Sequence, residues 1–203
     1  MQYTISNVEA LWPRINRTYR FDKVERKSVP CDAREELAAY EMSFRMTSSQ
    51  AKALHTAMVE AYNTVRKSQP AWPETFVNPF KKEEDTGCWI GKAKLKGAYN
   101  GELTQKPKQY DLTGVVQGDD FLLTTGSKVN VAVTMVPYSM KDNGVSLRLR
   151  AVQVVEYKPM ESDNPFGTTA PTPRAANDNP FGDNGPAVKP MDAFGLPPVQ
   201  AKP

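Results

Sequence analysis

Three lysines at every second position are the first feature of this chain that points to chemistry: Lys92, Lys94 and Lys96. Because successive side chains of an extended strand point to opposite faces, these ammonium groups would share one face, while Ala93 and Leu95 would point to the other. Cations beside aromatic rings are typical of surfaces that bind single-stranded nucleic acid, since cations neutralise phosphates and rings stack on bases. The alternative is an exposed edge strand whose lysines prevent pairing with other chains.

Cations and tyrosines suited to the same two roles continue beyond this row. Tyr99 follows the lysines, and Tyr138 would end a strand on the face opposite Val133 and Met135. Both tyrosines are therefore predicted to stack on bases. The predicted nucleic-acid-binding residues are Lys92, Lys94, Lys96, Tyr99, Lys106, Lys108, Tyr110, Lys128, Tyr138, Arg148 and Arg150.

The sequence contains few residues that could form a catalytic or metal site. Its two cysteines, Cys31 and Cys88, and its single histidine, His55, are too few for the usual zinc-ligand clusters. It has neither a glycine-rich phosphate-binding motif nor the spaced carboxylates of a two-metal nuclease. We therefore predict no enzyme, no catalytic residue, no metal and no cofactor, and we assign His55, beside an apolar helix stripe, to packing or to the rim of that stripe.

Hydropathy and charge suggest where the protein acts. Apolar runs stay shorter than the roughly 18 residues of a membrane span, and no signal peptide is recognisable. We expect a protein of the cytoplasm, the host cytoplasm if it is viral, with reduced cysteines and no membrane contact. Residues 1–160 hold 23 Lys and Arg against 18 Asp and Glu, whereas residues 161–203 hold 3 against 5. A basic body thus precedes a slightly acidic tail.

Alternating hydrophobicity predicts most of the strands. In residues 37–46 every second side chain is apolar, which is typical of a half-buried strand. Residues 129–137 and 145–157 alternate around the turn residues 141–144 and predict a long hairpin. Near residues 151–155 both faces become apolar, which predicts a bulge or burial on both sides.

The remaining N-terminal half has weaker patterns and one clear helix. Residues 17–27 alternate weakly and predict a first strand, and residues 1–13 are expected to form a surface arm anchored by Trp12. Apolar residues at three- and four-residue steps in residues 47–67 predict an amphipathic helix that begins at Thr47 or Ser48.

Residues 69–86 are predicted to form a long surface loop, because three prolines and a charged run disfavour regular structure. The loop carries Trp72, Phe76 and Phe80. These rings could serve as platforms for nucleobases, but we favour anchoring of the loop to the core.

These elements predict a mainly β fold, an OB-type antiparallel Greek-key barrel with one capping helix at about residues 47–67. The barrel would form a domain of residues 1–158 that binds single-stranded nucleic acid. Residues 159–203 are rich in Pro, Asn and Asp and almost lack aliphatic residues, which predicts a disordered C-terminal interaction tail.

A short module recurs in this tail. The run Asp163-Asn164-Pro165-Phe166-Gly167 returns as Asp178-Asn179-Pro180-Phe181-Gly182, and in reduced form as Asp192-Ala193-Phe194-Gly195. An aromatic residue beside an acid in a polar segment is typical of short motifs that insert into a pocket of a partner. The predicted partner-binding residues are Phe166, Phe181 and Phe194; the alternative is a spacer with incidental phenylalanines.

The hairpin also carries a resemblance to a known family. The run Gly126-Ser127-Lys128-Val129, continued through Val131 to Tyr138, is followed by Gly-Val-Ser-Leu-Arg-Leu-Arg-Ala-Val-Gln at residues 144–153. This sequence resembles the single-stranded-DNA-binding proteins of tailed bacteriophages, and the order of elements agrees over residues 37–157. The resemblance implies an OB fold, sequence-tolerant binding of single strands in DNA replication and recombination, and a C-terminal tail that recruits replication proteins.

The tail departs from that family, whose members usually end in a strongly acidic segment that closes on an aromatic residue. This chain instead ends Leu-Pro-Pro-Val-Gln-Ala-Lys-Pro, and its phenylalanine modules lie upstream. Competition between an acidic tail and DNA would therefore be weak here. Recruitment of partners through the phenylalanine modules is compatible with the sequence.

Two functions from different classes remain. The first is a sequence-tolerant single-stranded-DNA-binding protein that coats single strands in phage replication and recombination and recruits replication or recombination proteins through its tail. The alternative is an adaptor or virion structural protein in which the barrel is a scaffold and only the tail motifs bind partners. The sequence leaves the oligomeric state open, with a homo-oligomer among the alternatives.

Overall fold

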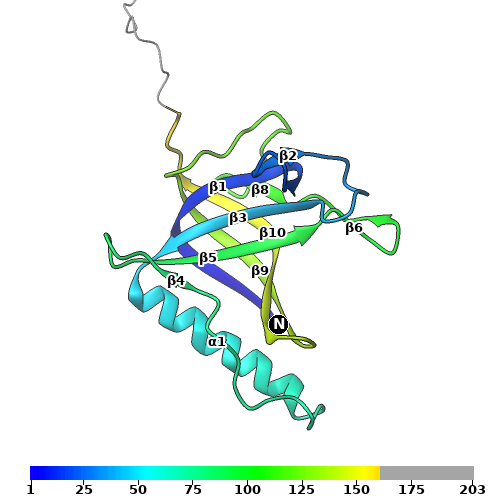
Figure 1. Ribbon diagram of the computed structural model, residues 1–203. Helices are drawn as coiled ribbons and strands as arrows, with labels where there is room; N and C mark the ends of the chain where they lie inside the picture. The colour runs from blue at the N-terminus through cyan, green and yellow to red at the C-terminus, as the bar shows by residue number, and fades with distance from the viewer. Residues whose placement is uncertain (161–203) are drawn as a thin grey trace, which may run out of the picture. The chain divides into compact units, whose positions relative to one another are not determined.

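The computed structural model describes residues 1–160, which form a mainly β barrel with one helix (Figure 1). The predicted tail of residues 159–203 falls almost wholly outside the described residues, as do Phe166, Phe181 and Phe194, so the predicted boundary at residue 158 stays a prediction. The elements are β1 Gln2–Asp22, β2 Lys27–Pro30, β3 Ala39–Met46, α1 Ser48–Arg66, β4 Lys81–Lys82, β5 Trp89–Lys96, β6 Ala98–Tyr99, β7 Glu102–Leu103, β8 Lys108–Tyr110, β9 Lys128–Ser139 and β10 Asn143–Glu156.

The strands form one strongly curved sheet in the order β4-β5-β3-β1-β9-β10-β8, with β2 paired to β1 and a separate β6-β7 hairpin. The sheet curls until β5 and β10 lie near each other, although no hydrogen-bonded ladder joins them (Figure 1). All neighbours are antiparallel except β8, which runs parallel to β10. The predicted fold class, a mainly β barrel with a capping helix, is confirmed.

Strand β1 shows where the pattern analysis was wrong. Residues 1–13 are not a surface arm, because β1 is the longest strand and pairs with β9 through its first part and with β3 through its second. Its register shifts three times, and Asn7 and Trp12 have φ angles of +50° and +46°. After each extra residue, the side chains that would have pointed to one face point to the other. The buried residues of β1 therefore do not alternate regularly along the sequence.

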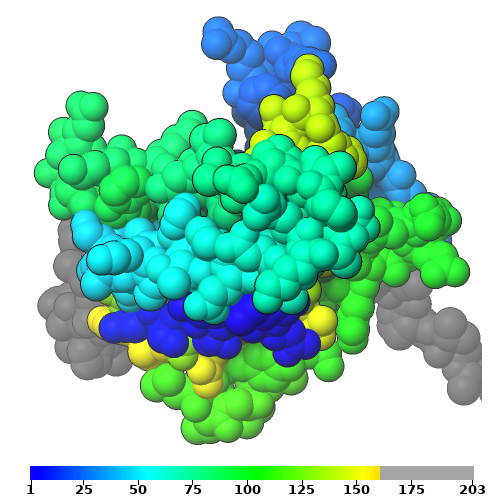
Figure 2. All heavy atoms as spheres, turned by 90° about the horizontal axis from the view of Figure 1, so that it is seen from below, coloured from blue at the N-terminus to red at the C-terminus, as the bar shows by residue number. Residues whose placement is uncertain are grey.

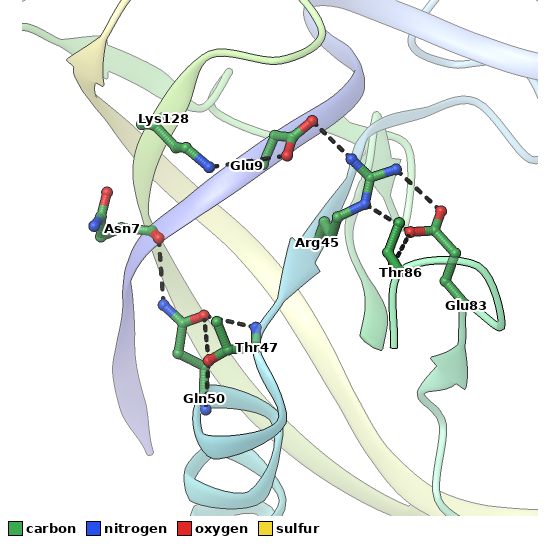
Figure 3. Close-up of polar contacts among 8 residues, drawn as sticks. All are labelled: Asn7, Glu9, Arg45, Thr47, Gln50, Glu83, Thr86 and Lys128. Carbon is green, nitrogen blue, oxygen red and sulfur yellow. Dashed lines mark hydrogen bonds and ion pairs between the residues drawn. The ribbon is translucent and has the colours of Figure 1, made fainter. Parts of the chain in front are cut away.

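The next two elements follow their sequence patterns closely. In β3 the four alternate residues Tyr40, Met42, Phe44 and Met46 are all buried, as predicted. Helix α1 begins after Thr47, whose side chain accepts a hydrogen bond from the amide of Gln50 while the Gln50 side chain accepts one from the amide of Thr47 (Figure 3).

Helix α1 covers one end of the barrel, and Figure 2 shows it across the lower face of the molecule beside the N-terminal part of β1. Leu54, Met58 and Tyr62 from its apolar stripe are fully buried in the core. The Gln50 side chain also donates hydrogen bonds beside the bulge of β1, to the backbone oxygen of Ser6 at 2.9 Å and to that of Asn7 at 3.3 Å; Figure 3 draws the contact with Asn7. The N-terminus of the helix is therefore fixed to the central strand.

The long loop after α1 is tied down by its aromatic residues, as predicted. The Trp72 and Phe76 rings lie 5.4 and 5.2 Å from the Tyr62 ring, measured between centroids. Phe80 is buried in the core. These rings anchor the loop, which ends in the two-residue strand β4.

The β9-β10 hairpin is confirmed, and so is the bulge. Opposite the β9 pair Ala132 and Val133, the β10 partners are Ala151 and Leu149, so Arg150 is an additional residue. A second shift follows between Val154 and Glu156. Arg148 and Arg150, two positions apart before the shift takes effect, share a face and border the same hollow, described below.

One arginine joins three parts of the barrel near α1. Arg45 of β3 donates to Glu9 of β1 at 2.8 Å and to Glu83, in the turn after β4, at 2.9 and 3.0 Å (Figure 3). Hydrogen bonds from Arg45 and Thr86 hold the pKa of Glu83 below its usual value. The Glu9 carboxylate also lies 3.8 Å from the Lys128 ammonium group. Two cations and two carboxylates thus form one row of ion pairs, Lys128–Glu9–Arg45–Glu83.

Candidate nucleic-acid interface

The lysine row lies on β5 with the geometry that its spacing predicts. Lys92, Lys94 and Lys96 are exposed, whereas the intervening Ala93 and Leu95 are buried. Strand β5 lies near β10 at the place where no hydrogen-bonded ladder closes the barrel. The three ammonium groups therefore lie along this gap in the ladder.

A groove of about 730 Å³, which we call the main groove, is lined by Leu95 of β5 and by residues 148–151 of β10 among others. It is also lined by the first residues of β1, by part of β9, by Tyr99 and by the segment that leads into β8. The groove brings together six of the predicted residues, Tyr99, Lys106, Lys108, Tyr110, Arg148 and Arg150. The parallel pairing of β8 with β10 places Lys108 beside Ala151, which joins these two distant parts of the chain.

Tyr99 links the lysine row to the main groove. It lies on the β6-β7 hairpin, its side chain is 40% exposed, and its ring centre is 5.6 Å from the Lys96 ammonium and 5.0 Å from the Arg148 guanidinium carbon. Contacts of this kind between a cation and a ring are favourable and orient the ring. Two cations therefore hold the ring at the edge of the groove, where a base could stack on it.

Tyr138 lies in a second hollow of about 470 Å³, the seam hollow, between β5 and β10. Lys92, Lys94 and Phe80 line the same hollow. The ring of Tyr138 lies over Gly144, its partner in the β9-β10 ladder, where an added Cβ would come within 2.9 Å of the tyrosine hydroxyl. The absence of a side chain at Gly144 thus gives the ring its position.

Carboxylates separate the predicted cations into two groups. Lys92 lies 2.6 Å from Glu41, Lys106 pairs with Asp119, and Lys128 lies near Glu9. Lys94, Lys96, Lys108, Arg148 and Arg150 form no ion pair with any residue of the described part of the chain. These five side chains are not held in ion pairs and can contact an anionic ligand, and of the five only Lys94 also lies opposite a carboxylate, that of Glu41.

Glu41 explains why Lys92 belongs to the first group. Burial alone would raise the pKa of Glu41, but the hydrogen bond and charge of Lys92, together with Lys94 and Arg14, hold that pKa below its usual value. Arg14 donates to the same carboxylate at 2.9 Å. Glu41 therefore stays ionised at neutral pH and compensates the charge of Lys92.

This difference predicts unequal effects of two neighbouring lysines. Lys94→Gln should reduce the salt dependence of single-strand binding by about 0.7 in log K per log salt, which is about a fivefold loss of affinity at roughly 0.1 M salt. Lys92→Gln should have a clearly smaller effect, since its charge is already compensated. Titrations at several salt concentrations measure both slopes, and equal losses would contradict the role given to Glu41.

Lys128 is the one predicted residue that the structure places apart. It begins β9, at the opposite end of that strand from Tyr138, and lines neither hollow. Its contact with Glu9 belongs to the network around Arg45 (Figure 3). The run at residues 126–129, in which Lys128 lies, does not show that this lysine is far from the other predicted residues.

Trp12 is a candidate that the pattern analysis missed. It is not an anchor, because its side chain is 62% exposed, and its amide donates a 2.9 Å hydrogen bond to Thr125. It borders a small hollow with Arg14 and Lys92. Exposed aromatic residues with a positive φ angle are uncommon and often occur at functional sites, but neither property can be read from the sequence.

The same residues, 1–160, offer no group of three or more His, Cys, Asp and Glu side chains that could hold a metal ion. Cys31 and Cys88 are free thiols, and burial raises the pKa of Cys31. Helix α1, the helix of the described region, is not apolar enough to cross a membrane.

Comparison with known proteins agrees with this geometry. No protein-family model and no curated protein matches the sequence. Among solved structures, gp2.5, a single-stranded DNA-binding protein encoded by bacteriophage T7, is similar with a TM-score of 0.59 at 17% identity, over 80% of this chain and 96% of that one. The chain has the fold of phage single-stranded-DNA-binding proteins.

A second phage protein supports the same assignment of fold. The single-stranded DNA-binding protein from bacteriophage Enc34, in complex with single-stranded DNA, is similar with a TM-score of 0.54 at 12% identity, over 78% of this chain and 88% of that one. The family resemblance predicted from the hairpin motif is thus confirmed at the level of the fold.

Proposed function

We propose that this chain binds single-stranded DNA without sequence preference and coats it during phage DNA replication and recombination in the host cytoplasm. The observation that carries the proposal is the convergence of Tyr99, Lys108, Arg148 and Arg150 on one groove. The lysine row of β5 extends the same surface. The fold shared with phage proteins of this class supports the proposal.

The chemistry of the groove favours a single strand over a duplex. Tyr99 and Tyr138 are both 40% exposed beside cations, and an unpaired base can stack on such a ring whatever its identity. In a duplex the base faces are already stacked, so these rings would have no partner. Lysines and arginines bind phosphates of any sequence, which fits binding without sequence preference.

The same groove supports binding rather than catalysis. None of its lining residues is Asp, Glu, His or Cys, so they provide no carboxylate or imidazole base, none of the usual metal ligands and no thiol nucleophile. An adaptor or virion structural protein would not need a cationic groove with exposed rings. A binding titration with single- and double-stranded oligonucleotides at two salt concentrations tests the proposal and separates it from this alternative.

For the tail we propose recruitment of replication or recombination proteins through Phe166, Phe181 and Phe194. The support is the sequence repeat alone. Several copies of one motif on one chain raise the effective concentration of the motif, so each copy strengthens binding of a partner.

Replacement of these phenylalanines should therefore act in steps. Phe166→Ala or Phe181→Ala alone should weaken capture of a polymerase or recombination protein partly, and the double variant should weaken it severely. Pull-down from infected-cell extract measures this, with oligonucleotide binding as the control that must stay unchanged. The same set of captured proteins with wild type and double variant would reduce the tail to a spacer.

A further inference from the structure

A third hollow, which the proposed function does not use, lies where the first turns of α1 meet β4 and the start of β5. It has a volume of about 330 Å³ and is lined by Lys52, His55, Asn78, Phe80, Lys82 and Trp89, with Ser48 and Ala51 at the helix. We call it the helix hollow. The sequence pattern predicted packing or a place at the rim of the stripe for His55, whose ring centroid lies 5.6 Å from that of Phe76.

The charged side chains that line the helix hollow are both lysines. Lys52 and Lys82 are exposed, and neither forms an ion pair with a residue of the described chain. No Asp or Glu lines the hollow, and the first turn of α1 contains no acidic residue. The two ammonium groups therefore add to the positive end of the helix dipole. An anion is the ligand that this arrangement attracts.

The hollow also offers aromatic surface. Trp89 is partly buried against the core, so its ring is fixed, and its remaining surface faces the hollow together with Phe80 and His55. A ring beside two cations is the same combination that Tyr99 and Tyr138 form at the other two hollows. A nucleotide, with a phosphate and a base, satisfies both parts.

The helix hollow and the seam hollow are neighbours. Phe80 lines both, so the two hollows lie on either side of the segment that contains Pro79 and Phe80. Strand β4 has one lysine on each face. In its ladder with β5, Lys81 is opposite Ile90 and Lys82 is opposite Trp89. Adjacent residues of a strand point to opposite faces, so Lys81 shares the face of Lys92 while Lys82 shares that of Trp89.

We propose that the helix hollow binds a further segment of the same single strand. The strand leaves the main groove through the seam hollow, crosses Pro79 and Phe80, and places phosphates on Lys52 and Lys82 and a base against Trp89. This inference rests on the proposed function and extends it, because it makes binding depend on the length of the strand.

The test is a series of oligothymidylates of about 6 to about 30 nucleotides, a range that spans the site sizes of single OB folds. The variant is Lys52→Gln with Lys82→Gln in the full chain, and its matched control is Lys23→Gln with Lys67→Gln, two exposed lysines outside all three hollows. For long oligonucleotides the variant should lose about 1.4 from the salt slope, roughly a 25-fold loss of affinity at 0.1 M salt, since each phosphate contact contributes about 0.7. Short oligonucleotides should bind equally to wild type, variant and control.

Two results would overturn the inference: a variant that binds long oligonucleotides as tightly as the control does, or one that loses affinity equally for short and long. Both leave the proposed function intact, because short oligonucleotides report on the main groove and the lysine row of β5 without the helix hollow. Failure of the wild-type protein to bind any oligonucleotide would instead contradict the proposed function itself.

Discussion

Replacing Tyr99 and Tyr138 together by Leu should make the free energy of single-strand binding less favourable by about 2 to 6 kcal/mol, because each stacked base contributes about 1 to 3 kcal/mol. The two rings lie in different hollows, so their losses should nearly add. The salt slope should stay nearly unchanged, since no charge is removed. Fluorescence titration of each single variant and of the pair measures the loss.

Stability separates stacking from packing in this experiment. Both side chains are 40% exposed, so Leu should leave the melting temperature nearly unchanged. Tyr157→Leu is the matched control, since that ring is also exposed but packs on Phe121, 5.4 Å away between centroids and outside the hollows. Normal affinity of the folded double variant would show that neither ring stacks on a base.

Replacing Lys108, Arg148 and Arg150 by Gln should lower single-strand affinity about a hundredfold at roughly 0.1 M salt. The reason is counterion release: each phosphate contact contributes about 0.7 to the salt slope, so three contacts contribute about 2. These residues are suited to the test because none of them forms an ion pair within residues 1–160, and all three line the main groove. Titration from low to high salt gives the slope directly.

The control for this variant removes the same number of charges elsewhere. Lys23, Lys67 and Lys128 lie outside the main groove and the seam hollow, so their replacement by Gln lowers the net charge equally. It should change affinity only slightly, through the long-range field. Equal losses in the two triple variants would mean that net charge, and not the groove, determines binding.

The elements that the sequence predicted well are those with a single local signal. Helix α1 has an apolar stripe and a capping box between Thr47 and Gln50, so its observed bounds of Ser48–Arg66 fall within the predicted residues 47–67. The alternation of β3 and of the β9-β10 hairpin was equally direct. In β1 three register shifts interrupt the alternation, so no single period could reveal the central strand.

The site could be predicted only in its components. The exposed face of β5 follows from alternation alone, but the approach of Arg148 to Tyr99 depends on how the barrel curls. Ion pairs also depend on the tertiary structure. The sequence therefore did not predict that Glu41 compensates the charge of Lys92, or that Lys128 pairs with Glu9 away from the other predicted cations. The exposure of the Trp12 ring likewise depends on the tertiary structure.

The central claim is that this barrel binds single strands through its charges and rings. The most direct measurement is a titration with a short labelled oligonucleotide, as a single strand and as a duplex of the same sequence, at two salt concentrations. The single strand should bind more tightly, with a salt slope of about 3.5 from the five uncompensated cations, so a fourfold rise in salt should lower its affinity about a hundredfold. Equal or tighter binding of the duplex, or single-strand affinity that salt does not change, would contradict the account.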